Sequence, residues 1–191
     1  MSHKFDPAKV HVLESAERRK AMQPRRFLRR LGLKRGQTFI DVGAGTGFFA
    51  LPAAGIVGPG GSVFALDVSE AMLEHMRAKS PPAWLEVLAS EESRLPVPDG
   101  AGDLVFTSFV LHEVEDPVAF LREMGRAAKP YAPVVILEWA KVRQAEGPPF
   151  AHRLHHHRVE ALVLEAGLCF RGLEFVNPSQ YWVTAFRKGV R

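Results

Sequence analysis

The chain has 191 residues, of which 47% are hydrophobic and 24% are charged. These values are ordinary for one soluble globular domain, and they exclude disordered, collagen-like and low-complexity chains. The single cysteine, Cys169, excludes an internal disulfide and a metal site built from several thiolates, so we expect a reducing, cytoplasmic location. The first fifteen residues have no apolar run that resembles a signal peptide. Residues 42–66 carry no charge, but seven glycines and two prolines interrupt them, so we expect no membrane-spanning helix.

The formal net charge of +4 is unevenly distributed along the chain. Residues 1–36 hold eleven Lys and Arg against three Asp and Glu, whereas the rest of the chain is net negative. Such a segment is either an arm that binds nucleic acid or a solvated basic helix face. Aromatic residues do not alternate with these arginines, as they do in proteins that bind single strands, which favours the helix face. We expect one domain, 1–191, with a basic helical N-terminal cap over 1–36 and a cofactor-binding α/β core over 37–191.

The predicted elements after residue 24 alternate between helices and strands. Pro24 opens a helix that Gly32 ends, and residues 37–42 form the first strand. A helix near 48–57 and a strand over 62–67 follow, and Ser69 is placed to cap the next helix. The remaining elements are strands over 84–89, 103–108 and 133–139, helices from Asp116-Pro117 and over about 159–166, and a closing hairpin of residues 168–176 and 180–188.

This alternation predicts an α/β fold, in which a mainly parallel sheet lies between two layers of helices. The closing hairpin requires one strand of the sheet to run antiparallel. In open sheets of this kind, ligands bind at the carboxyl ends of the strands, where the strand order reverses. The candidate site residues are therefore those that follow the first four predicted strands.

A glycine-rich loop, D-V-G-A-G-T-G at residues 41–47, directly follows the first predicted strand and precedes a helix. Glycines permit a tight turn and a close approach of the backbone to a ligand, and the helix N-terminus offers unpaired N–H groups. A dinucleotide fingerprint requires a glycine at position 48, where this chain has Phe48. The carboxylate of Asp41 would repel a pyrophosphate but attract a cation. The loop therefore predicts a cationic ligand and disfavours a nicotinamide reductase.

Three further groups follow the next three strands. Asp67 lies 20 residues beyond Gly47, where an acid either accepts hydrogen bonds from two ribose hydroxyls or caps the next helix. Glu91 and Glu92 follow the third strand, where a carboxylate either binds an exocyclic amine such as that of adenine or stays solvated. His112 follows the fourth strand and is either a proton acceptor or a packed side chain.

Four segments together resemble the class I S-adenosylmethionine-dependent methyltransferases: the glycine loop, VFALDVSEAML, the acidic loop before LPVPD, and VFTSFVLHEVEDP. Within that class the chain is most similar to the type 11 branch, which includes ubiquinone and menaquinone methyltransferases. The resemblance extends from about Phe5 to the final YWVTAFRK run. It implies a three-layer, Rossmann-like methyltransferase fold with a seven-stranded, mostly parallel sheet, in the order 3-2-1-4-5-7-6 with one antiparallel strand.

The resemblance also implies a cofactor, S-adenosyl-L-methionine, with S-adenosyl-L-homocysteine as its product, and an unidentified small-molecule acceptor. Asp41 and the glycine loop would hold the methionyl part, and Asp67 the ribose. Glu91, where the family usually has Asp, would bind the adenine amine, and His112 is a candidate catalytic base. The expected cofactor-binding residues are Asp41, Gly43, Ala44, Gly45, Gly47, Asp67, Val68, Met72, Glu91, Glu92, Ser108 and Phe109.

An RNA-associated protein, or a cofactor-binding module without turnover, is the alternative because of the basic segment 1–36. The fourth strand is not followed by the [Asp/Asn]-Pro-Pro-aromatic motif, which weighs against methylation of adenine or amide nitrogen. Arsenite methyltransferases resemble the VLHE region but use several cysteines, so the lone Cys169 argues against that activity. We assign no metal site, because His152 and residues 155–157 favour a solvated helix start over a ligand set.

Residues 1–24 are expected to act as a lid over the pocket. The segment over 140–151 is too short to form a substrate domain, so the pocket would otherwise be open to water. Arg18, Arg19 and Lys20 would stay solvated. The apolar residues expected to face the pocket are Phe5, Val10, Val12, Leu13 and Met22.

Overall fold

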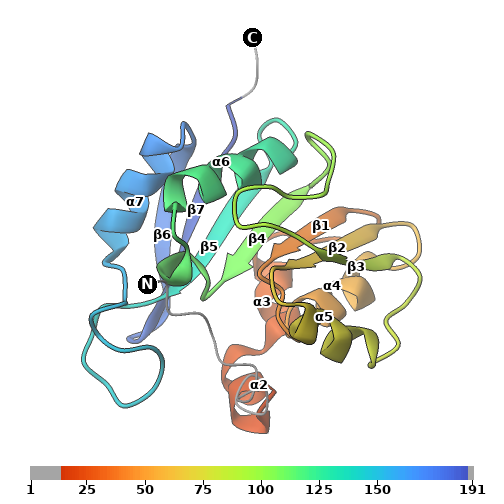
Figure 1. The fold of residues 1–191 in the computed structure, drawn as a ribbon, viewed down its shortest axis with the longest axis horizontal. Coiled ribbons are helices and arrows are strands. Elements are labelled where there is room, and N and C mark those ends of the chain that lie inside the picture. The colour runs from red at the N-terminus through yellow and green to blue at the C-terminus, as the bar shows by residue number, and fades with distance from the viewer. Residues whose placement is uncertain (1–13, 189–191) are drawn as a thin grey trace.

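One seven-stranded sheet organises residues 14–188, the part of the chain that this computed structural model describes (Figure 1). The strand order is β3-β2-β1-β4-β5-β7-β6, which confirms the order implied by the resemblance. β7 pairs antiparallel with both β5 and β6, and the other neighbouring strands pair in parallel. The strands are β1 (Thr38–Val42), β2 (Ser62–Asp67), β3 (Leu85–Ala89), β4 (Leu104–Ser108), β5 (Pro133–Trp139), β6 (Cys169–Asn177) and β7 (Gln180–Phe186).

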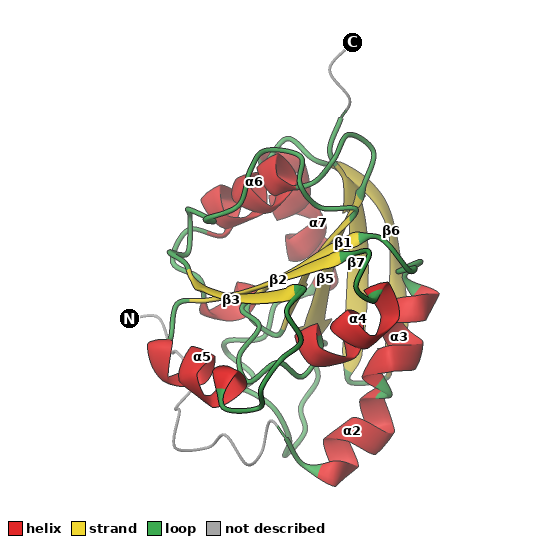
Figure 2. Ribbon diagram, turned by 90° about the vertical axis from the view of Figure 1, so that its right-hand side faces the viewer, coloured by secondary structure: helices red, strands yellow, loops and turns green. Residues whose placement is uncertain are grey.

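Helices cover both faces of the sheet, as Figure 2 shows. One apolar core joins the sheet to α6 and α7, and the second joins it to α3, α4 and α5. In the second core Phe106 of β4 contacts Phe27 and Phe49, with ring centroids 6.1 and 4.8 Å apart. The helices are α2 (Ala16–Met22), α3 (Pro24–Arg30), α4 (Ala50–Val57), α5 (Glu70–Arg77), α6 (Pro117–Ala127) and α7 (His156–Glu165), with a 3₁₀ helix over Leu111–Glu113.

Local sequence signals account for several helix ends. Pro117 occupies the first turn of α6, and the side chain of Asp116 accepts hydrogen bonds from two backbone N–H groups of that turn. Gly32 and Gly167, which follow α3 and α7, have φ of +92° and +79°. A residue with a Cβ rarely adopts this conformation, so glycine ends both helices, as predicted.

Three predicted boundaries were wrong by two residues or more. The helix expected over about 159–166 is α7, which begins at His156. The helix expected over 48–57 begins at Ala50, because residues 43–49 are used in the turns of the glycine loop. Pro52 therefore lies in the first turn, where the N–H group that it lacks would have no helical partner. The last strand ends at Phe186 rather than at 188. The hydroxyl of Ser69 makes no capping bond at the start of α5, although the residue stands at the N-cap position.

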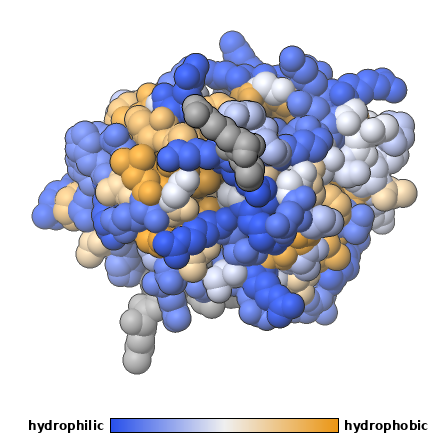
Figure 3. Space-filling model, turned by 90° about the horizontal axis from the view of Figure 1, so that it is seen from above, coloured by the Kyte–Doolittle hydropathy of each residue, from blue (hydrophilic) through white to orange (hydrophobic). Residues whose placement is uncertain are grey.

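The basic segment is helical where the structure describes it, as α2 and α3 joined at Gln23. No helix within residues 14–188 is long and apolar enough to cross a membrane. The face seen from above in Figure 3 mixes hydrophilic and apolar side chains. The lid residues Phe5, Val10, Val12 and Leu13 lie outside the described residues.

Candidate cofactor and acceptor site

The glycine loop follows β1 at the point where the strand order reverses, because β1 lies between β2 and β4. Its three glycines, Gly43, Gly45 and Gly47, have φ of +74°, +53° and +86°, which explains their residue type. A Cβ at Gly43 would lie 2.3 Å from Cγ2 of Val110, so the segment after β4 packs directly against the loop. The loop thus forms part of a site shared by β1 and β4.

Asp41, at the base of the loop, is buried, and neither carboxyl oxygen has a hydrogen-bond partner within residues 14–188. Burial and the nearby charge of Asp67 raise the pKa of Asp41 to about 8, although a weak interaction with the backbone N–H of Ala50 opposes the shift. An unpaired buried carboxyl is costly unless a partner arrives. The ammonium and sulfonium of S-adenosylmethionine are such partners, so the residues present fit that cofactor.

Asp67 ends β2 and ties the glycine loop to the start of α5. Its Oδ2 accepts a hydrogen bond from the backbone N–H of Gly45 at 2.7 Å, and its Oδ1 accepts one from the N–H of Ser69 at 2.8 Å. Burial raises the pKa of Asp67 in spite of these bonds. Asp67 therefore binds backbone N–H groups before the next helix, close to the capping alternative that the sequence left open beside ribose binding. The residue is 9% exposed, so part of it can still contact a ligand.

A pocket of about 460 Å³ lies next to Asp67, beyond the carboxyl ends of β2 and β3. Three of the residues expected to bind adenine or lie near it, Val68, Glu91 and Glu92, line this pocket. Glu92 also accepts a hydrogen bond from the backbone N–H of Glu115, so it joins the two sides of the pocket. Met72 does not line it, because this side chain is packed in the core beneath α5.

The segment after β4 is strained at Phe109, whose φ is +60°. The backbone N–H of Phe109 donates to the carbonyl of Leu137, and its ring lies 5.0 Å from the indole of Trp139. Such outliers persist where surrounding contacts determine them, and they cluster at functional sites. Ser108 and Phe109 thus follow β4, which lies between β1 and β5, whereas the pocket lined by Val68, Glu91 and Glu92 follows β2 and β3.

His112 is paired with a carboxylate that the sequence analysis missed. Its Nδ1 lies 2.9 Å from Oε2 of Glu138, and the two side chains are 4% and 0% exposed. Burial lowers the pKa of His112, but the hydrogen bond and charge of Glu138 and the charge of Glu113 outweigh burial, so the pKa is raised. The available signal was a lone acid inside the apolar run PVVILEW.

The described part of the expected lid packs against the glycine loop. Glu14 pairs with Lys79, whose ammonium also donates to the carbonyl of Thr46. The guanidinium of Arg18 lies 4.1 Å from the ring centroid of Phe48, which corrects the expectation that Arg18 is fully solvated. Burial lowers its pKa to about 10.

The four histidines between residues 152 and 157 are not all on one helix. His152 lies before α7, which begins at His156, so these two residues do not share a helix face. The imidazoles of His155, His156 and His157 each offer a nitrogen within 4.8 Å of the others. Their ring centroids lie 4.3–5.1 Å apart, and His155 stacks on His157 while His156 is tilted against both.

The described structure therefore gathers Asp41, the glycine loop and Asp67 at one edge of the sheet. The pocket lined by Val68, Glu91 and Glu92 lies on one side of them, and Phe109 and His112 follow the neighbouring strand on the other. A sheet in this order, with a glycine loop at its reversal point, defines the Rossmann-like methyltransferase fold class.

Comparison with known proteins agrees with this class. The family model of the methyltransferase domain, type 11, matches residues 40–136. The crystal structure of a SAM-dependent methyltransferase from Aquifex aeolicus is 35% identical, with a TM-score of 0.89 over 95% of this chain and 98% of that one. The chain therefore belongs to the class I S-adenosylmethionine-dependent methyltransferases, in the type 11 branch.

Two curated relatives are demethylmenaquinone methyltransferases. The protein from Geobacillus kaustophilus is 36% identical over 114 residues, which is 58% of this chain. The protein from Staphylococcus aureus is 32% identical over 139 residues, which is 72% of this chain. The matches span 49% and 56% of the lengths of these two relatives, so about half of each is matched.

Proposed function

We propose that this protein transfers the methyl group of S-adenosylmethionine to a small-molecule acceptor. The observation that carries the proposal is the buried, unpaired carboxyl of Asp41 beneath a glycine loop at the reversal point of the sheet. When bound, the cofactor supplies a methyl group on a positively charged sulfur. The protein supplies the position of the two reactants and the exclusion of water.

Different residues would bind different parts of the cofactor. Asp41 and the backbone of Gly43, Ala44, Gly45 and Gly47 would hold the charged methionyl part. Asp67 would accept hydrogen bonds from the ribose, and Val68, Glu91 and Glu92 would enclose the adenine. Ser108 and Phe109 would contact the cofactor from the segment after β4, and Met72 would support the site from beneath α5.

His112 is the proposed general base, which would take a proton from a methyl acceptor that must be deprotonated before it reacts. Its position after β4, two residues beyond the Val110 that packs on Gly43, supports this role. Its side chain is shielded from bulk water, which keeps the proton transfer within the site.

Packing within the protein accounts for several basic residues of the N-terminal segment, which disfavours an RNA-binding arm. Arg25 donates to the carbonyl of Gly55, and Arg30 forms an ion pair with Glu174 at 2.7 Å. Arg18 lies over Phe48.

Calorimetry with S-adenosylmethionine tests the proposal directly. Gly45→Val places a branched side chain at φ +53°, beside the N–H that Asp67 binds, and we expect it to abolish binding in a protein that still folds. Gly60→Val is the matched control, because a Cβ there meets open space and binding should persist. Unchanged affinity in a folded Gly45→Val variant would reject the cofactor site.

The acceptor class is tested separately. Because two relatives are named for demethylmenaquinone, its reduced, short-chain form is the first probe, followed by other phenols and amines. Transfer of a labelled methyl group to one of these compounds supports a small-molecule acceptor. Transfer to RNA alone would reject it.

A further inference from the structure

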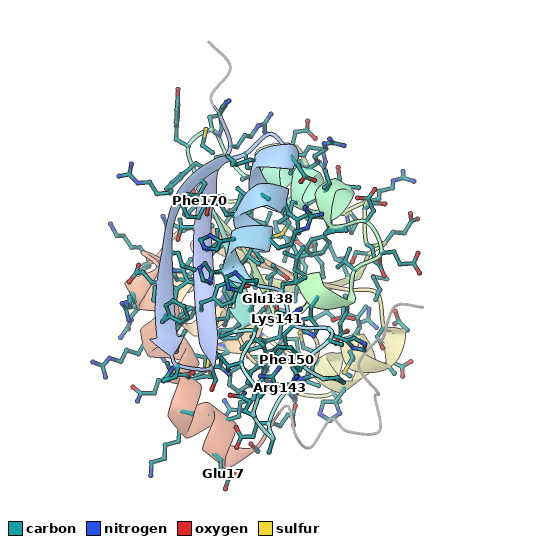
Figure 4. The ribbon with its side chains drawn as sticks, turned by 90° about the vertical axis from the view of Figure 1, so that its left-hand side faces the viewer. Glu17, Glu138, Lys141, Arg143, Phe150 and Phe170 are labelled. Atoms are coloured by element: carbon teal, nitrogen blue, oxygen red, sulfur yellow. The ribbon has the colours of Figure 1, made fainter. Side chains whose placement is uncertain are left out.

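Glu138 is a fully buried carboxylate on the acceptor side of the proposed site. It is the sixth residue of β5, and Figure 4 places it within the body of the molecule, where β5 leads into the loop that bears Lys141, Arg143 and Phe150. A buried carboxylate loses its hydration, so one that interrupts an apolar strand requires compensating hydrogen bonds.

Three N–H groups provide those bonds, and two of them belong to His112. Oε1 accepts from the backbone N–H of His112 at 3.2 Å, Oε2 accepts from the ring Nδ1 at 2.9 Å, and Oε2 also accepts from the N–H of Trp139 at 3.1 Å. Nitrogen atoms of His112 and Trp139 therefore contact both oxygens of this buried carboxyl group.

The bond at Nδ1 determines the chemistry of the other ring nitrogen. When Nδ1 carries the proton of the neutral imidazole, Nε2 retains a lone pair and can take a proton. Nε2 lies 3.6 Å from Oε1 of Glu113, which is too long for a hydrogen bond. Glu138 thus leaves His112 with one basic nitrogen whose orientation is set by two bonds from β5.

Other charged and titratable groups face this pair. Glu113 adds negative charge from the 3₁₀ helix, and Arg153 adds positive charge from the loop before α7. Arg153 is 2% exposed, and its guanidinium donates to backbone carbonyls of that loop, including that of Val142 at 2.9 Å. Tyr181, the register partner of Glu138 on β7, donates to the carbonyl of Leu154 at 3.0 Å.

We propose that Glu138 is a positioning residue, which holds His112 in the Nδ1–H form so that Nε2 removes a proton from a protic acceptor such as a phenol or alcohol. The inference rests on the proposed function. The O–H bond of the acceptor breaks, its proton passes to Nε2, and the electron pair stays on the acceptor oxygen. The resulting imidazolium is neutralised by Glu138. An acceptor that attacks without losing a proton would not need this pair.

Nitrogen-15 spectra of the histidines test the positioning role in the resting protein. We expect His112 to titrate above pH 6.5 in the wild type and to carry its neutral proton on Nδ1. Glu138→Gln keeps the shape but removes the charge, and we expect the pKa of His112 to fall by about one unit or more. Glu113→Gln is the matched control and should leave the proton on Nδ1. A neutral proton on Nε2 in the wild type, or the same titration in Glu138→Gln, would overturn the proposal.

Turnover of reduced short-chain demethylmenaquinone, a diphenol probe, tests the catalytic consequence. Wild-type kcat should rise with pH as His112 loses its proton, and Glu138→Gln should lower the plateau about 100-fold and move this rise to lower pH. Affinity for S-adenosylmethionine should not change, and Glu138→Asp, which keeps the charge, should restore part of the rate. Equal kcat values and pH profiles in the wild type and Glu138→Gln would overturn the inference. If the wild type does not bind S-adenosylmethionine, the proposed function is rejected instead. The titration decides the positioning role whether or not this probe is methylated.

Discussion

At the residue scale, the buried carboxyl of Asp41 couples the protein to pH. Its pKa is raised to about 8 in the folded protein from 3.8 in an exposed chain, so between these values the folded state holds a proton that the unfolded state lacks. The free energy of unfolding contributed by this group is therefore present below about pH 4 and falls as pH rises towards 8.

Replacing Asp41 by Asn tests this coupling in the cofactor-free protein. We expect the free energy of unfolding of the wild type to fall relative to that of Asp41→Asn by up to about 1.4 kcal/mol per pH unit between pH 5 and 7.5. Urea unfolding at several pH values measures the difference. Calorimetry in two buffers should also show a proton released when S-adenosylmethionine binds the wild type, and less release in the variant. Parallel stability profiles would show that Asp41 is already ionised.

Asp67 holds the glycine loop and is proposed to bind the ribose. Asp67→Ala should weaken cofactor binding by about 1.5–3 kcal/mol, the range for hydrogen bonds to a charged group, which is roughly tenfold to more than a hundredfold in affinity. Calorimetry measures the loss. Ser69→Ala is the control, because that hydroxyl makes no capping bond and its removal should leave affinity unchanged. Equal affinity in the wild type and Asp67→Ala would show that Asp67 only holds the backbone N–H groups of Gly45 and Ser69 and does not bind the cofactor.

At the scale of elements, α2 connects the basic segment to the glycine loop. Glu14 pairs with Lys79, Lys79 donates to Thr46, and Arg18 lies over Phe48, so this segment contacts the C-terminal end of the loop. These contacts are consistent with a segment that closes over bound cofactor, which is the role expected for residues 1–24. The structure describes residues 14–24 of this segment, and these contacts involve that part of it.

Hydrogen exchange of residues 14–24 tests the lid. We expect slower exchange when S-adenosylhomocysteine is added, because the ordered loop beneath α2 then holds the helix in place. Arg18→Ala should reduce this protection, whereas Lys20→Ala, whose side chain is exposed, should not. Protection by RNA but not by cofactor, at both low and moderate salt, would assign the segment to nucleic acid.

At the scale of the whole molecule, the site lies between elements from both halves of the sheet. The residues proposed to bind the cofactor end or follow β1, β2 and β3, whereas His112 follows β4 and Glu138 lies in β5. A ligand at this edge would therefore contact elements from both halves of the sheet.

Binding should stabilise the entire domain. S-adenosylhomocysteine at 100 times its Kd should add about 2.7 kcal/mol, which raises the Tm of a domain of this size by about 5–10 °C. Differential scanning calorimetry measures the shift, with NADH as the control that should produce none. A shift with NADH alone would revive the nicotinamide reductase that Phe48 disfavours.

The order of strands and helices could be predicted from the sequence because each element carries a local signal. Apolar runs mark β1 to β5, and Asp116-Pro117, Gly32 and Gly167 mark helix ends by backbone chemistry that needs no distant partner. The spacing of the glycine loop and Asp67 likewise predicted that they lie close together, because the carboxyl ends of neighbouring parallel strands lie at the same edge of the sheet. The wrong start of α4 arose where a turn of the loop competed with a helical pattern.

The sequence by itself determined the fold class, the family and the residues proposed to hold the cofactor. Only the tertiary structure decided that Glu138 pairs with His112, that Arg18 lies on Phe48 and that both oxygens of Asp67 bind backbone N–H groups. Periodicity and turn chemistry describe each segment in isolation. A contact between side chains 26 or 30 residues apart depends instead on which strands become neighbours and how closely they pack, since a buried charge is stable only where its partners converge.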